Sequence, residues 1–350
     1  MIQIIYNREV LDNGDFVTSA DITTDNTLPE NITFTVDNKI IELRDKKINN
    51  ENAHFDFETI PELCTLSFDR EKFINRLSLP QIVMHGAGKD TDIHVKFKCD
   101  PYMNEFEQDI FQTDEIELSY SLYASPYASP NSEKKRPLVL FLHGSGERGF
   151  DNQMPLLAND VPKTLYEYAK NKEDAVILVP QATWAPTLNG WFRKEFRKAL
   201  LTLLDSIVEK FNIDKNRIYL SGLSNGASTT WYMGAKHSDI FAALVPCSGY
   251  VYDDNKEAFG EQGKGRYMLV TNDEAKALSK LPIWTFHAED DPTVGILGTK
   301  KVKEAIANIG GNKLKVTIYP KGTVTPNPHA SWAFAYNNSE LLPWLFDQHK

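Results

Sequence analysis

Ser224 lies in the segment Gly222-Leu-Ser-Asn-Gly226, whose residue types suit a serine nucleophile held on a sharp turn. The strand-like run Arg217–Ser221 precedes the serine, and a helix is expected to follow over residues 227–236. A strand-to-helix turn is tight, so small residues are needed two positions on either side of the serine. The pattern therefore predicts that Ser224 is displayed at the end of a strand as a nucleophile.

A serine hydroxyl is a poor nucleophile at neutral pH, so it needs a histidine base. When the serine stands on such a turn, the acid follows it in the chain and the histidine comes last. Only His329 and His349 follow an acid at a strand end beyond Ser224, and His349 is the second-last residue, where chains commonly fray. We therefore predict that His329 is the base.

Three carboxylates directly follow the strand-like run Leu281–Phe286, and they are Glu289, Asp290 and Asp291. The acid must accept a hydrogen bond from the imidazole and hold the imidazole in the right tautomer. Asp291 is preferred because Pro292 biases its backbone towards an extended, restrained conformation. Asp290 is the alternative.

Backbone N–H groups are expected to stabilise the negative charge that develops on the substrate oxygen. Asn225, the residue after the nucleophile, offers one donor, and Gly144 or Ser145 in the loop after the first strand of the second domain offers another. His143 precedes Ser224 in the chain and is expected to support this loop rather than act as a second base.

Three tryptophans, Trp184, Trp191 and Trp332, flank loops expected at the carboxyl edge of the sheet, where aromatic walls often grip a substrate. They are predicted to bind substrate, with ordinary packing as the alternative. The consecutive residues His287–Asp291 have no second motif with metal-ligand spacing. No metal and no cofactor are therefore expected.

The pattern of apolar and polar residues changes along the chain, and this change predicts two domains. Residues 1–115 contain short alternating stretches separated by Asn, Asp and Gly, including a hairpin over Ile32–Val36 and Lys39–Leu43, and they predict a β-sandwich. Residues 116–350 alternate continuous apolar runs with helical stretches such as Phe196–Phe211, and they predict an α/β fold with helices on both faces of a mostly parallel sheet.

Bulk composition excludes several classes of protein. The formal net charge of −10 argues against a general nucleic-acid binder, because phosphate binding relies on clustered Lys and Arg. Three cysteines cannot form a complete disulfide framework. No apolar run is long enough to span a membrane, so we expect either a cytoplasmic protein or a secreted one whose signal peptide is absent from this sequence.

Residues from about 118 to 350 resemble the α/β-hydrolase superfamily, and within it the bacterial esterases related to feruloyl esterases and polyhydroxybutyrate depolymerases, often labelled predicted peptidases. The segments that carry the resemblance are Pro137–Gly149, Val179–Ala182, Asn216–Gly226, His287–Val294 and His329–Trp332. The resemblance implies an α/β-hydrolase fold, in which Ser224 is the nucleophile, Asp291 the acid and His329 the base. Some relatives carry an immunoglobulin-like domain in front, and residues 1–115 are similar in strand pattern.

These residues predict a serine carboxylesterase that acts on short-chain or aryl esters of the feruloyl or acetyl type, free or linked to a polysaccharide. A serine peptidase of the same fold shares every catalytic group, and a catalytically inactive hydrolase-fold binding protein is the alternative from another class. Assembly of the chain into a homo-oligomer through its first domain is left open.

Overall fold

The structure is a computed structural model of the chain and describes all residues except 30, 89–90, 185–189 and 252–269. The chain forms two compact units. Unit 1 comprises Met1–Asp69, Asn75–Glu105 and Leu157–Asp160, and unit 2 comprises Arg70–Ile74, Phe106–Leu156 and Val161–Lys350. Each unit therefore contains segments that are distant in the sequence.

Unit 1 is built mainly of β-strands. Its larger sheet has the strand order β10 (Ile93–Lys98), β1 (Ile2–Leu11), β2 (Gly14–Thr24), β6 (Asn52–Phe57) and β5 (Leu43–Ile48). Only the pair β1 and β10 is parallel. A smaller antiparallel sheet has the order β4 (Lys39–Ile40), β3 (Thr33–Val36) and β9 (Ile82–His85). The remaining short elements are β7 (Leu66–Asp69), which pairs with β8 (Ile74–Leu77), and the 3-10 helices η1 (Pro61–Leu63) and η2 (Pro101–Glu105).

The two sheets of unit 1 share one apolar core. The ring of Phe34, on β3, lies 5.1 Å from Phe55 and 5.0 Å from Phe57, both on β6, and all three side chains are fully buried. The predicted hairpin is present as β3 and β4, joined by Asp37 and Asn38, which both have positive φ, as a two-residue hairpin turn requires. Its second strand is shorter than predicted, because Leu43 begins β5 in the other sheet.

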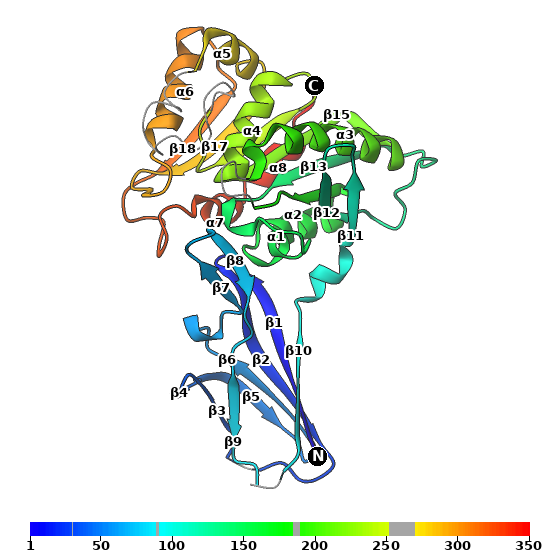
Figure 1. Cartoon of the computed structure of the whole chain (residues 1–350), viewed down its shortest axis with the longest axis vertical. Helices are drawn as coiled ribbons and strands as arrows, with labels where there is room; N and C mark the ends of the chain where they lie inside the picture. The colour runs from blue at the N-terminus through cyan, green and yellow to red at the C-terminus, as the bar shows by residue number, and fades with distance from the viewer. Residues whose placement is uncertain (30, 89–90, 185–189, 252–269) are drawn as a thin grey trace. The chain divides into compact units, whose positions relative to one another are not determined.

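Unit 2 contains an eight-stranded sheet with α-helices, drawn in the upper part of Figure 1. The strand order is β11 (Glu107–Gln112), β12 (Glu117–Tyr123), β14 (Val176–Gln181), β13 (Arg136–Leu142), β15 (Ile213–Leu223), β16 (Ala243–Cys247), β17 (Ile283–Ala288) and β18 (Leu314–Tyr319). The six strands β14, β13, β15, β16, β17 and β18 are parallel to one another, whereas β11 pairs antiparallel with β12 and β12 pairs antiparallel with β14. The continuous apolar runs that the sequence predicts to be strands overlap six strands of this sheet, β13 to β18, and these runs are residues 138–142, 175–179, 218–220, 241–245, 283–286 and 314–319.

Helices cover both faces of the sheet, and the side chains on both faces of its central strands are therefore buried. In β13, Leu138 and Leu140 belong to the core that includes Leu200 of α3, while Val139 points the other way and is equally buried. One layer consists of α3 (Lys194–Lys210), α4 (Asn225–Lys236), α5 (Asn272–Leu278) and α6 (Leu297–Asn308), and the other of α2 (Val161–Tyr168), α7 (Ser331–Tyr336) and α8 (Leu341–Phe346). The predicted helical stretch Phe196–Phe211 corresponds to α3. The shorter elements are α1 (Met154–Leu157), η3 (Ser145–Glu147), the π-helix η4 (Ala169–Glu173) and η5 (Gly190–Phe192).

The compact units divide at Glu105 and Phe106, ten residues before the boundary expected from the sequence. Strand β11 accounts for the difference, because it pairs along its whole length with β12 and so joins the large sheet. Its alternating pattern resembles that of the strands before it, and the sequence therefore gives no local sign of the change of sheet. The division into domains at residues 115 and 116 stays a prediction.

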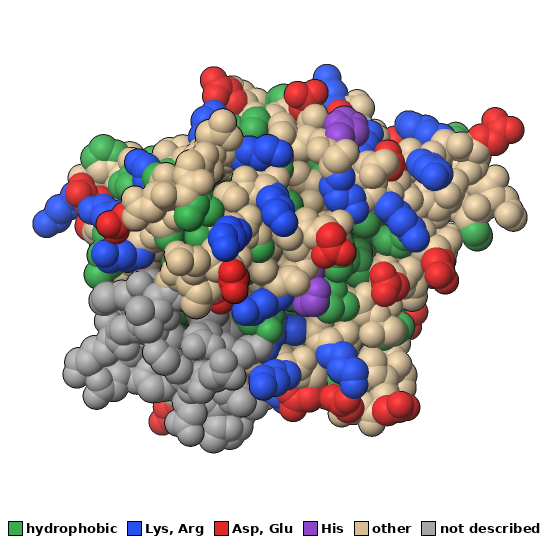
Figure 2. Space-filling model, turned by 90° about the horizontal axis from the view of Figure 1, so that it is seen from above, with side chains coloured by type: hydrophobic (Ala, Val, Ile, Leu, Met, Phe, Trp, Pro, Cys, Tyr) green, Lys and Arg blue, Asp and Glu red, His purple; other side chains and the backbone are tan. Residues whose placement is uncertain are grey.

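Charged side chains of both signs are interspersed over the described part of the face shown in Figure 2. No continuous basic surface gathers there, which agrees with the acidic net charge of −10. In the described parts of the chain, no helix has both the length and the apolar character that crossing a bilayer would require.

Candidate active site

Ser224 occupies a strained turn between the end of β15 and the start of α4. Its φ of 53° and ψ of −113° lie outside the regions that side-chain-bearing residues usually adopt. A Cβ on Gly222 would lie 2.5 Å from the carbonyl oxygen of Gly226, and a Cβ on Gly226 would lie 1.9 Å from that of Leu142. The turn therefore requires glycine at both positions, for the steric reason that the sequence suggested.

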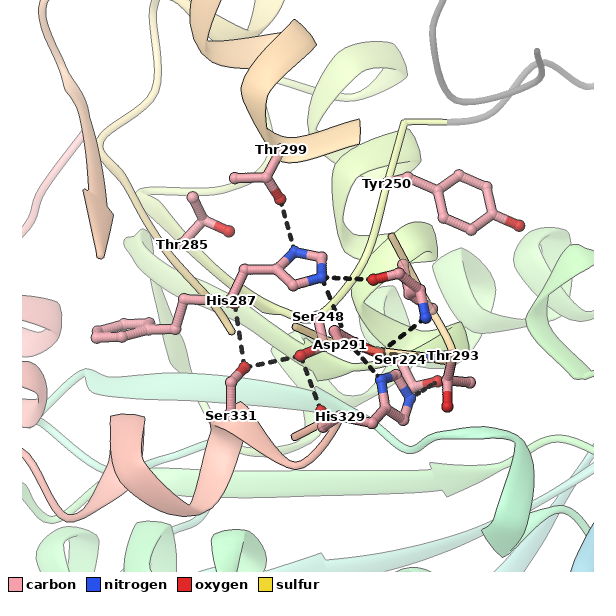
Figure 3. A network of polar contacts seen from close by, with 12 residues as sticks. Ser224, Ser248, Tyr250, Thr285, His287, Asp291, Thr293, Thr299, His329 and Ser331 are labelled. Atoms are coloured by element: carbon pink, nitrogen blue, oxygen red, sulfur yellow. Dashed lines mark hydrogen bonds and ion pairs between the residues drawn. The ribbon is translucent and has the colours of Figure 1, made fainter. Parts of the chain in front are cut away.

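Three side chains from separate segments meet at the carboxyl edge of the large sheet (Figure 3). The Nε2 atom of His329 lies 2.9 Å from Oγ of Ser224, and Nδ1 of His329 lies 2.7 Å from Oδ2 of Asp291. Because an ionised carboxylate only accepts, Nδ1 carries the proton, and Nε2 can accept the hydroxyl proton of Ser224. The predicted residues are thus brought within hydrogen-bonding reach, although Ser224 and His329 are 105 positions apart.

Asp291 is fixed by donors on both of its carboxylate oxygens. Oδ1 accepts the backbone N–H groups of Thr293 at 2.8 Å and Val294 at 2.9 Å. Oδ2 accepts His329 and lies 3.2 Å from Nε2 of His287. Burial raises the pKa of Asp291, but contacts with His287 and His329, the charge of His329 and the backbone N–H of Val294 together outweigh burial and bring this pKa well below its usual range. The carboxylate therefore stays ionised at neutral pH.

Asp290, the alternative acid, turns away from the histidine. Its Oδ2 accepts the backbone N–H of Gly322 at 3.0 Å. Asp291 is therefore the carboxylate that contacts His329. The restraint on Asp291 comes from the N–H groups two and three residues further on, in addition to any bias from Pro292.

The loop that carries His329 is held by two serines that sequence reasoning missed. The hydroxyl of Ser248 donates to the carbonyl oxygen of His329 at 2.9 Å and lies 2.7 Å from the hydroxyl of Ser331. The side-chain oxygen of Asn327 also accepts the backbone N–H of His329 at 3.1 Å. The base is thus fixed through its backbone as well as through its ring.

The loop that follows β13 lies against the nucleophile. A Cβ on Gly144 would be 3.4 Å from Cβ of Ser224. Ser145 begins η3 and Asn225 begins α4, so both N–H groups stand at the start of a helix, where N–H groups point out along the axis. The roles of Asn225, Gly144 and Ser145 as donors to an oxyanion stay predictions.

His143 supports this loop from within. Its Nδ1–H donates to the carbonyl oxygen of Gly144 at 2.6 Å, and its Nε2 accepts the N–H of Ala182 at 2.9 Å. Burial lowers the pKa of His143 to about 3, with a further contribution from the charge of Arg148, although the hydrogen bond to Gly144 opposes it. The ring is therefore neutral and acts as a structural link.

Arg148 holds the other end of the loop. Its Nε donates to the carbonyl oxygen of Ser145 at 2.6 Å, and its Nη2 donates to those of Lys72 at 3.1 Å and Phe73 at 2.8 Å. Lys72 and Phe73 belong to the segment Arg70–Ile74 of unit 2. No sequence pattern connects this segment to the loop, and sequence reasoning missed it.

The three tryptophans predicted to bind substrate have different surroundings. Trp191 is fully buried, and its indole N–H donates to the carbonyl oxygen of His143 at 3.1 Å. It has no surface to offer a substrate, and this part of the prediction is wrong because the ring instead packs behind the loop. Trp332 is half-buried with its ring edge-on to His329, at 5.2 Å between centroids. Trp184 is also half-buried, and Nζ of Lys72 lies 5.5 Å from its ring centroid.

No group of three or more His, Cys, Asp or Glu side chains is arranged to hold a metal ion among the residues that the structure describes. Of the consecutive residues His287–Asp291, Asp291 is the acid that contacts His329. His287 lies on the far side of that acid from His329 (Figure 3).

Comparisons with known proteins find similar esterases and depolymerases. The model of the family described as Esterase PHB depolymerase matches residues 118–266. The chain is 29% identical over 133 residues to the bifunctional acetylxylan esterase/xylanase XynS20E of Neocallimastix patriciarum, a match that covers 37% of this chain and 17% of that protein. It is 27% identical over 157 residues to poly(3-hydroxyalkanoate) depolymerase C of Paucimonas lemoignei, which covers 40% of this chain and 36% of that protein. The chain thus spans about a third or less of the length of these relatives.

A solved structure is similar over the whole length of the chain. The crystal structure of a thermostable esterase superposes with a TM-score of 0.80 and covers 99% of both chains, at 23% sequence identity. This likeness shows the fold, which is the α/β-hydrolase fold preceded by an all-β region. The predicted fold class and the predicted resemblance to the α/β-hydrolase esterases are confirmed.

The turn at Ser224 yields a first test. Gly226→Ala should lower the free energy of unfolding by roughly 3 kcal/mol, because the new Cβ meets a backbone carbonyl that cannot move aside. Gly295→Ala is the control, since a Cβ there meets nothing within 4 Å. Urea unfolding followed by tryptophan fluorescence measures both, and equal midpoints for the two variants would contradict the steric argument.

A second test concerns the pH dependence that His143 imparts to stability. In the unfolded chain the ring of His143 takes up a proton near pH 6.5, and in the folded chain it does so only near pH 3. The unfolded state therefore binds more protons than the folded state as the pH falls. The contribution of the neutral His143 ring to the free energy of unfolding is complete above about pH 6.5. It decreases as the pH falls below this value, by at most about 1.4 kcal/mol per pH unit.

The measurement compares urea midpoints of wild type and His143→Gln between about pH 8 and about pH 5. The variant should lose less stability on acidification than wild type, because its amide does not titrate. His349→Gln, which changes an exposed histidine, should keep the wild-type slope. An unchanged slope in His143→Gln would show that the buried ring takes up its proton without unfolding.

Proposed function

We propose that the chain is a serine carboxylic ester hydrolase in which Ser224 is the nucleophile, His329 the base and Asp291 the orienting acid. The observation that carries the proposal is the continuous hydrogen-bonded chain from Asp291 through His329 to Ser224, with distances of 2.7 and 2.9 Å. A nucleophile, a base and an orienting group in contact form the arrangement that acyl transfer requires.

In the first half of the reaction, Nε2 of His329 takes the hydroxyl proton while Oγ of Ser224 bonds to the carbonyl carbon of the ester. The carbonyl oxygen becomes an oxyanion, towards which the N–H groups of Asn225 and of Gly144 or Ser145 are proposed to point. The protonated His329 then gives its proton to the departing alcohol oxygen as the carbon–oxygen bond breaks. An acyl-enzyme on Ser224 remains.

In the second half, Nε2 of His329 takes a proton from water, whose oxygen attacks the acyl carbon. Collapse of the second tetrahedral intermediate releases the carboxylic acid and returns the proton to Oγ of Ser224. Asp291 stays ionised throughout, because it stabilises the imidazolium without accepting its proton. The depressed pKa of Asp291 supports this role.

Ester substrates are favoured over amides by the names of the two curated relatives, one an acetylxylan esterase and one a poly(3-hydroxyalkanoate) depolymerase. We propose short-chain or aryl esters, of the acetyl or feruloyl type, either free or attached to a polysaccharide. The half-buried ring of Trp332 beside His329 supports an apolar or aryl group at the reacting end of the substrate.

Ser224→Ala tests the nucleophile. It should lower kcat for nitrophenyl esters by at least about 10³-fold, since the attacking atom is removed while the fold is retained. It should also abolish covalent labelling by a fluorophosphonate probe. Ser206→Ala, which makes the same change on helix α3 where the hydroxyl bonds only its own helix, should behave as wild type.

The same assay decides between the alternatives. Matched ester and amide substrates separate an esterase from a peptidase, because an amine is a much poorer leaving group than an alcohol. Wild-type protein that hydrolyses neither substrate and takes no label at Ser224 would instead be a binding protein with this fold.

Asp291→Asn tests the orienting acid. The amide can present its NH2 group to Nδ1, where the carboxylate could only accept a hydrogen bond, so the imidazole favours the wrong tautomer and kcat should fall by about 10⁴-fold. Asp290→Asn is the matched control, because that carboxylate contacts Gly322 and not His329. Steady-state kinetics on one nitrophenyl ester measures both variants, and a comparable loss in both would refute the assignment of Asp291.

A further inference from the structure

A second imidazole contacts the carboxylate of Asp291, and the reaction described above does not use it. His287 lies on β17 with no exposed surface. Its Nε2 is 2.8 Å from the carbonyl oxygen of Val294 and 3.2 Å from Oδ2 of Asp291, and its Nδ1 is 2.8 Å from the hydroxyl of Thr299 (Figure 3). Every nitrogen of the ring therefore has a polar partner.

The partners of His287 fix its tautomer. A carbonyl oxygen can only accept, so the contact with Val294 places a proton on Nε2. In the neutral ring Nδ1 is then an acceptor, and the hydroxyl of Thr299 can donate to it. The Nε2–H of His287 therefore donates to the carbonyl oxygen of Val294, and Oδ2 of Asp291 lies 3.2 Å from the same nitrogen.

The contact with His287 completes the set of polar groups around Asp291. Two backbone N–H groups hold Oδ1, and because both oxygens turn together about the Cβ–Cγ bond, each contact to Oδ2 also helps to fix the plane of the carboxylate. The partners of Oδ2 are His329 on one side and His287 on the other. Without His287, only the group that must be oriented would hold Oδ2.

The chemistry of a buried ring excludes a more direct role. His287 has no surface that a substrate could reach, and its partners in the network are Asp291, Val294 and Thr299. The hydrogen bond from His287 is also the largest of the effects that lower the pKa of Asp291, against the opposing and larger effect of burial. Both observations indicate that His287 acts through the acid.

We propose that His287 is a positioning residue that fixes the Asp291 carboxylate in the plane that His329 requires, and that Thr299 keeps His287 in the donating tautomer. The consequence for the reaction rate rests on the proposed function. The consequence for the hydrogen bond between Asp291 and His329 does not, because it concerns geometry alone.

The experiment compares His287→Leu, which removes the donor and keeps an apolar side chain, with His287→Gln, whose terminal amide can donate from near the position of Nε2. His287→Leu should lower kcat for a nitrophenyl ester by roughly 10- to 100-fold and leave KM little changed, since misplaced catalytic groups cost rate rather than binding. His287→Gln should recover most of the rate. Thr299→Val should show a smaller loss in the same direction.

Thr285→Val is the matched control for Thr299→Val. It removes a buried hydroxyl from the same strand as His287, one that donates to the carbonyl oxygen of Pro246 and takes no part in the network. Its kcat should equal that of wild type. Circular dichroism and the thermal midpoint of each variant show whether the protein is folded.

A spectroscopic readout makes the test independent of turnover. The proton on Nδ1 of His329, hydrogen-bonded to Asp291, should give a resolved low-field proton resonance in wild type. The resonance should broaden or move upfield in folded His287→Leu, and His287→Gln should restore it.

Two results would overturn the proposal. In one, folded His287→Leu keeps the wild-type kcat and resonance. In the other, His287→Gln is as impaired as His287→Leu, so that packing rather than the donor matters. Failure of the proposed function gives a different result, because wild-type protein would then show no ester turnover and no labelling of Ser224. The resonance of His329 would still test the role of His287 in that case.

Discussion

The hydrogen bonds on either side of the His329 ring are the interactions on which the rest of the site depends. Each requires an atom to be placed within a few tenths of an ångström, yet the three residues come from segments that are far apart in the chain. The parallel sheet solves this problem, because the carboxyl ends of β15 and β17 reach the same edge. The loops that follow β15, β17 and β18 then bring the three residues into contact.

Placing the nucleophile has an energetic cost that the surroundings offset. A residue with a side chain at the φ and ψ of Ser224 is strained by about 1–3 kcal/mol. The strain persists because β15 and α4 are fixed on both sides of it, with the N–H of Ser224 bonded to the carbonyl oxygen of Cys247 at 3.0 Å. Ser248, at the end of the neighbouring strand, also has a positive φ of 55° and supports the loop of the base. Two positions with unusual backbone angles thus lie where side chains must be aimed.

Much of the fold and the central part of the site could be predicted from the sequence, because both leave local patterns. Buried strands appear as continuous apolar runs, and the turn at Ser224 requires a particular spacing of glycines. Chain order then limits the base to His329. The residues that the sequence did not reveal act through contacts between distant segments, such as Ser248 with His329 or Arg148 with Lys72. Burial misled in one case, since nothing local distinguishes Trp191, behind the loop, from a tryptophan that faces solvent.

The discontinuity of unit 2 has a consequence for how such a protein can be divided. Residues 70–74 are encoded well before the rest of that unit, and two of them supply carbonyl oxygens to the buried guanidinium of Arg148. A gene fragment that began at Phe106 would omit both acceptors and leave this cation short of partners. No single cut in the coding sequence can therefore separate the hydrolase body intact, and recombination that exchanges only the front of the chain must preserve this short piece.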